Sequence, residues 1–195
     1  MSWRRAVSLV AVAATVAACG GSKDPKTAPT PEELNAAALG VPVWFVKPPV
    51  DSNILYAPVS AVSRDMQLAI DKAQSNGRFA LAQQLETRFE GMSKRFQEET
   101  GAGADAQILE QFSVAYKGIV MQTVNGSRMT KQEIRNEGTQ FRVYALMELP
   151  SGPAAVALQQ RIRSNEQLLT RMRATQAYAE LDAQVKRYQE TQKEP

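Results

Sequence analysis

The sequence predicts a single α+β domain in which a small antiparallel sheet packs against helices. Residues 141–149 alternate in side-chain type with a period of two, which is typical of a strand. Residues 64–99 and 105–123 instead repeat apolar side chains every three or four positions, which is typical of helices. Long helical runs separated from the strand run favour an α+β arrangement.

The first predicted strand covers residues 54–59, ILYAPV. Pro58 has no backbone N–H, so we expect this strand at a sheet edge or near its end at Pro58. The preceding residues 41–50, VPVWFVKPPV, contain three prolines, which argue against a central strand. We expect an extended arm there, with Trp44 and Phe45 anchoring it to the domain.

A long helix is predicted over residues 64–99, with Ser63 as its N-cap. Gly77 lies on the apolar stripe, where we expect another backbone to approach closely. Leu68 and Phe79 lie on a different side, which predicts that the first half of the helix is covered on two faces. The stripe consists of Met66, Ile70, Ala73, Gly77, Leu81, Leu85, Phe89, Met92 and Phe96.

A second helix is predicted over residues 105–123, and Asn125-Gly126 ends it. A hairpin follows, with its first strand within 127–136 and a turn at 136–138. Its second strand, 141–149, directs alternate side chains to opposite faces. We expect three strands in one antiparallel sheet, with the helices packed on one side.

A long C-terminal helix is predicted over residues 154–192. Its apolar residues change face, which indicates either a break near Thr175 or a distal half that packs on something different. The second reading makes the distal stripe a candidate contact for a partner or a second copy, whereas the simpler alternative folds the tail back onto its own domain. The candidate contact residues are Tyr178, Leu181, Val185 and Tyr188.

The N-terminus has the layout of a bacterial lipoprotein signal peptide. Arg4 and Arg5 precede an apolar stretch that is too short to span a bilayer, and small residues then lead to Cys19. We expect cleavage before Cys19, whose thiol would carry a diacylglycerol group with fatty acids such as palmitate. An ordinary secretory signal peptide is the alternative.

These patterns divide the chain into a signal peptide (1–18), an acylated cysteine with a flexible tether (19–40) and one α+β domain (41–195). The tether is rich in glycine, proline and polar residues, which cannot bury enough apolar surface to fold. Within it, Pro31-Glu32-Glu33-Leu34 is a candidate start of a short helix. The residue directly after Cys19 is Gly20 and not an aspartate, which favours a lipid anchor in the outer membrane, on its periplasmic face or on the cell surface.

Composition removes histidine and thiolate chemistry from the domain. The chain contains no histidine, and Cys19 is its single cysteine. This removes the commonest general base, the commonest metal ligand and any intramolecular disulfide. We therefore expect no enzymatic activity, no metal site and no cofactor. Positive and negative charges nearly balance once the two signal arginines are removed, so we also expect no nucleic-acid partner.

Several runs, taken in order, resemble the LPP-twenty lipoprotein family. They are WFVKPPV (44–50), ILYA (54–57), DMQLAIDKAQSNGRFALAQQLE (65–86) and FRVYALMELP (141–150). One departure is Pro58-Val59, where the family usually has Val-Gly. The resemblance implies a surface or outer-membrane lipoprotein, in some members linked to flagellar outer-membrane parts, and it implies no catalytic residue.

We therefore expect a membrane-anchored envelope lipoprotein with a structural or protein-interaction role. Its expected partners are the membrane, through Cys19, and either an envelope protein or another copy of itself. The alternative is a periplasmic binding module for cell wall or for a small apolar ligand, which would bind between the sheet and the helix at 64–99.

Overall fold

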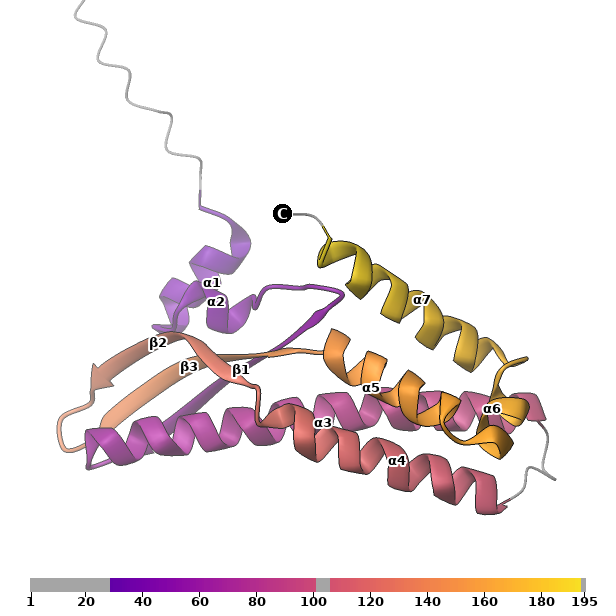
Figure 1. Cartoon of the computed structure of the whole chain (residues 1–195). Helices are drawn as coiled ribbons and strands as arrows, with labels where there is room; N and C mark the ends of the chain where they lie inside the picture. Colours follow the sequence, from indigo (N-terminus) through magenta and orange to yellow (C-terminus); the bar gives the residue numbers. More distant parts are fainter. Residues whose placement is uncertain (1–28, 101–105, 194–195) are drawn as a thin grey trace, which may run out of the picture.

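The computed structural model describes residues 29–100 and 106–193. Figure 1 shows a small sheet that lies beside the first half of one long helix, with the other long helices gathered over its second half. The elements are α1 (Pro31–Leu39), α2 (Val43–Val46), β1 (Ile54–Ser63), α3 (Met66–Thr100), α4 (Ala106–Val124), β2 (Arg128–Asn136), β3 (Phe141–Pro150), α5 (Gly152–Arg163), α6 (Glu166–Met172) and α7 (Gln176–Thr191).

The three strands form one antiparallel sheet in the order β1-β3-β2. The predicted α+β class and the small antiparallel sheet are therefore confirmed. β3 is the central strand, and its residues from Val143 to Leu149 are buried on both faces. β1 is an edge strand, as Pro58 predicts, but it continues through Pro58-Val59 to Ser63 instead of ending at residue 59.

One face of the sheet packs on α3. Gly77 lies at this contact, where an added Cβ atom would overlap Cγ of Met147 and lie 3.3 Å from Cγ2 of Val59. A close approach does occur at Gly77, but the group that approaches is the side chain of Met147 on β3 and not the predicted backbone. Ala69 and Ala73 continue the same small-residue surface and are fully buried. These three residues let the helix lie close to the sheet.

Helices cover both faces of the sheet, so the prediction of helices on one side was wrong. α1 and α2 lie on the face opposite α3 (Figure 1). Phe45 on α2 packs edge-on against Tyr144 of β3, with 5.1 Å between the ring centroids. The predicted extended arm contains this helical turn, because Pro42 at the N-cap and the following apolar residues allow one.

α1 lies within the stretch predicted to be a flexible tether. Thr30 and Glu33 form a capping box: Glu33 N donates to Thr30 Oγ1, and Thr30 N donates to Glu33 Oε2. Ala36 is buried, and Lys47 pairs with Glu32 at 3.0 Å. α1 therefore belongs to the folded part of the chain, and the tether ends before Pro31.

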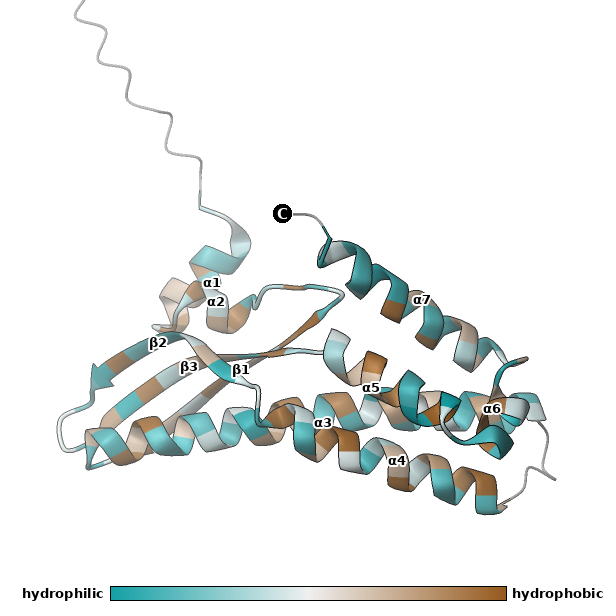
Figure 2. Cartoon of the chain, viewed as in Figure 1, coloured by the Kyte–Doolittle hydropathy of each residue, from teal (hydrophilic) through white to brown (hydrophobic). Residues whose placement is uncertain are grey.

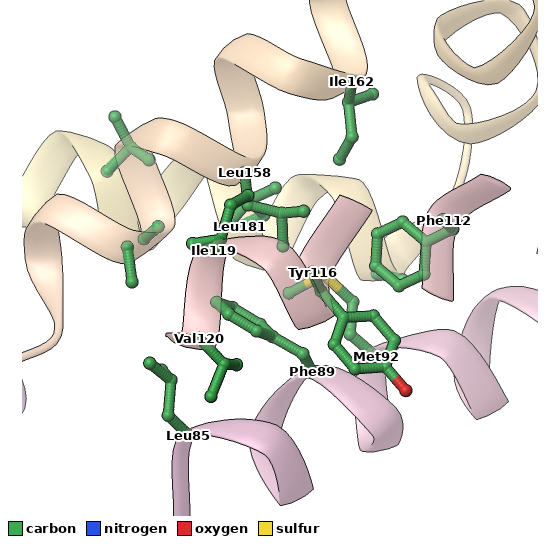
Figure 3. Packing of buried hydrophobic residues seen from close by; sticks show 14 of the residues in the cluster. Leu85, Phe89, Met92, Phe112, Tyr116, Ile119, Val120, Leu158, Ile162 and Leu181 are labelled. Atoms are coloured by element: carbon green, nitrogen blue, oxygen red, sulfur yellow. The ribbon is translucent and has the colours of Figure 1, made fainter. Parts of the chain in front are cut away.

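The main core lies where α3, α4, α5 and α7 meet. Figure 3 shows side chains from all four helices directed toward one another. The residues labelled there are Leu85, Phe89 and Met92 on α3, Phe112, Tyr116, Ile119 and Val120 on α4, Leu158 and Ile162 on α5, and Leu181 on α7. Burial of aromatic and branched side chains stabilises this junction by about 1.5–3 kcal/mol per residue.

The C-terminal region forms three helices, so the prediction of one long helix was wrong. Of the two alternatives for its change of face, the break near Thr175 is the one observed, and a second break lies at Ser164-Asn165. Asn165 Oδ1 accepts from Leu168 N at 3.0 Å, and Thr175 Oγ1 accepts from Tyr178 N at 3.2 Å. Both side chains are N-caps, and each starts a new helix in a new direction.

Two predictions about the start of α3 were also wrong. Asp65 caps the helix in place of Ser63, because Asp65 Oδ1 accepts from Leu68 N at 2.7 Å. Leu68 and Phe79 are exposed, at 47% and 65%. The described part of the chain therefore does not cover a second face of the first half of α3.

Candidate functional site

The predicted lipidation residue, Cys19, lies outside the described residues. Its acylation therefore stays a prediction from the sequence. Among the described helices, none is long and apolar enough to cross a membrane.

The predicted partner contacts on α7 instead hold α7 to its own domain. Leu181 and Val185 lie in the main core. The ring of Tyr188 lies directly over Gly152 at the start of α5, where an added Cβ atom would overlap it. Tyr178 Oη accepts from Arg163 Nε on α5 at 3.2 Å. The tail is folded back, and its outward face is largely hydrophilic (Figure 2).

Polar contacts around Asp182 join α7 to α5 beside this apolar contact. Gln159 Nε2 donates to Asp182 Oδ1 at 2.8 Å, and Lys186 Nζ lies 2.8 Å from Asp182 Oδ2. Arg163 Nη2 lies 3.5 Å from Oδ1. The hydrogen bond from Lys186 and its positive charge, followed by the hydrogen bond from Gln159 and the positive charge of Arg163, lower the pKa of Asp182.

A shallow apolar hollow lies beside α2, and its volume is about 570 Å³. We call it the α2 hollow; its walls are Val43, Trp44, Lys47, Pro48, Pro49, Val50 and Lys131. Val50 is 98% exposed, and Trp44 is only partly buried. The sequence indicated Trp44 as an anchor but gave no sign that the surrounding apolar residues stay exposed. The α2 hollow is the candidate functional site nearest to Cys19 in the sequence.

The site predicted for an apolar ligand, between the sheet and α3, is filled by side chains at Gly77. Met147 and Val59 fill the space between the sheet and α3 there. Other hollows lie along α4, α5 and α6, and polar side chains such as Gln111, Arg161 and Asn165 line them. Among the described residues, no group of three acidic, histidine or cysteine side chains could hold a metal ion.

Comparisons with protein families, with curated proteins and with solved structures give no match to this chain. The resemblance to LPP-twenty lipoproteins therefore stays a prediction from the sequence.

Proposed function

We propose that this chain is a lipid-anchored protein of the bacterial outer membrane with a structural or protein-interaction role. The observation that carries the proposal is the run from Met1 to Cys19, with its basic start, short apolar segment and small residues before a single cysteine. A partner among envelope or flagellar outer-membrane proteins fits the family resemblance.

The position of α1 supports a domain held near the bilayer. The capping box starts α1 at Pro31. At about 3.5 Å per extended residue, the chain from Cys19 to Thr30 spans about 40 Å at most. The link therefore keeps the start of α1 within about 40 Å of the bilayer, and α1 and α2 are the elements closest to it in the chain.

The composition of the α2 hollow suits the membrane surface. Tryptophan is enriched where its apolar ring and its indole N–H can lie at the level of the lipid headgroups. Lys131 is an exposed basic residue of the same hollow, and basic residues are attracted to anionic headgroups. Lys47 is also exposed there, but its charge is paired with Glu32. We propose that the α2 hollow rests on the leaflet that holds the acyl chains of Cys19.

Tryptophan fluorescence tests this arrangement, because Trp44 is the only tryptophan from Cys19 onward. Protein purified from cell membranes would be reconstituted into phospholipid vesicles with and without brominated acyl chains. We expect a blue-shifted Trp44 emission that the brominated lipids quench. In the Val50→Ser variant, which alters an exposed wall residue, we expect weaker quenching.

The controls distinguish anchoring through Cys19 from contact of the α2 hollow with the membrane. A Cys19→Ser form should stay in solution and show no quenching. If the wild-type protein does not bind vesicles at all, the lipid anchor is refuted. If it binds but Trp44 is not quenched, the anchor stands and the contact of the α2 hollow with the membrane is refuted.

The alternative function, a periplasmic binding module for an apolar ligand, has less support. Its predicted site between the sheet and α3 is filled at Gly77 by Met147. Among the described hollows, the α2 hollow has strongly apolar walls, and it is shallow and open to solvent.

A further inference from the structure

A second hollow, between α3 and α7, contains an excess of positive charge. Its volume is about 440 Å³, within the range of small-molecule sites. Arg88 and Arg95 lie two turns apart on α3, and Arg187 faces them from α7. Glu180 is the only carboxylate among the described residues of its wall, and it pairs with Arg95 at 2.8 Å.

Arg88 is half-buried and has no carboxylate partner among the described residues. Its Nη1 donates to Ser151 Oγ at 3.3 Å, and that hydroxyl donates to the Asn53 carbonyl at 3.0 Å. Ser151 is 1% exposed, so Arg88 is held by a fixed group. Burying a guanidinium group without a neighbouring opposite charge is energetically unfavourable, and folded proteins usually pair such groups.

Arg187 adds to the excess of positive charge in the hollow between α3 and α7. It is exposed, and no carboxylate of the described chain pairs with it. Burial, followed by repulsion from Arg187, lowers the pKa of Arg88. With Arg95 neutralised by Glu180, two guanidinium groups remain without counter-charge on one hollow.

We propose that the hollow between α3 and α7 binds a phosphate group, with Arg88 and Arg187 as its two charged ligands. A phosphate monoester carries about −1.5 to −2 charges at pH 7, which matches the two unpaired arginines better than one carboxylate would. Guanidinium groups also bind phosphate oxygens through paired hydrogen bonds. The phosphate can belong to a soluble compound or to a lipid headgroup.

Calorimetric titration with inorganic phosphate tests this site in the full chain carrying Cys19→Ser, which removes the proposed anchor. Chloride at equal ionic strength would be the blank. We expect saturable binding, and we expect Arg88→Gln and Arg187→Gln each to weaken it by about tenfold or more. Arg173→Gln, an exposed arginine outside the hollow, should leave the affinity unchanged.

The same proteins would be mixed with phosphatidylcholine vesicles that contain or lack phosphatidic acid. Arginine-dependent binding of inorganic phosphate supports a soluble ligand, and arginine-dependent binding only to the phosphatidic acid vesicles supports a lipid headgroup. Binding to neither probe, or binding that Arg187→Gln leaves unchanged, overturns the proposal. Because Arg187 is exposed, its substitution keeps the test valid even if Arg88→Gln does not fold.

Discussion

At the scale of single residues, Gly77 determines how closely α3 approaches the sheet. Gly77→Ala would place a methyl group against Met147 Cγ and Cβ and near Val59. Overpacking of this kind costs about 1–3 kcal/mol, whereas the gain in helix propensity is at most about 1 kcal/mol. We therefore expect the substitution to lower the free energy of unfolding, as measured by urea denaturation.

Gly91 is the matched control on the same helix. An added Cβ atom there meets nothing within 4 Å, so Gly91→Ala should raise the free energy of unfolding by up to about 1 kcal/mol. Equal effects at the two glycines would show that the contact between Gly77 and Met147 is not tight.

The sequence could predict Gly77 because the glycine lies on a regular apolar stripe of a long helix. It could not predict the arginine hollow, because Arg88 and Arg187 lie far apart in the chain and on separate helices. Their proximity depends on the two breaks near Asn165 and Thr175, which direct α7 back over α3. Only the second of these breaks was among the sequence predictions.

At the scale of secondary structure elements, long and strongly periodic runs were predicted well. α3 and α4 lie within two residues of their predicted ends, because apolar side chains repeat along their full length. The shorter helices begin at capping residues and not at the start of a long apolar repeat. Thr30 with Glu33 at α1, and Asn165 at α6, are local polar signals within stretches that were interpreted as tether and as continuous helix.

The contact of α7 with α5 should depend on pH through Asp182. Its pKa is lowered in the folded protein, so its charged form contributes stability above the unfolded pKa of about 3.9. That contribution is lost as the pH falls through the lower, folded pKa. We expect Asp182→Asn to destabilise the protein at pH 7 and to reduce the further loss of stability on acidification to about pH 3.

Asp71→Asn, at an exposed aspartate of α3, provides the comparison. Urea unfolding at both pH values gives the two free energies for each protein. If Asp182→Asn and Asp71→Asn change the pH dependence equally, the contacts of Asp182 with Lys186, Gln159 and Arg163 do not contribute to acid sensitivity.

At the scale of the whole molecule, two hollows of the domain have different proposed partners. α1, α2 and the α2 hollow are closest in sequence to the proposed lipid anchor, whereas the arginine hollow lies between α3 and α7. The apolar side chains of α7 are occupied within the domain, so a protein partner must contact other surfaces. Exposed apolar residues of the described chain that remain for such a contact include Phe79 on α3 and Met121 on α4.

We propose that the mature chain begins with an acylated Cys19. Mass spectrometry of protein isolated from bacterial membranes tests it most directly. We predict an N-terminal peptide that starts at Cys19 and carries a diacylglycerol group, and we predict its loss in the Cys19→Ser form. An N-terminal peptide that includes residues 1–18, or one that shows Cys19 as a free thiol in the soluble fraction, would contradict the claim.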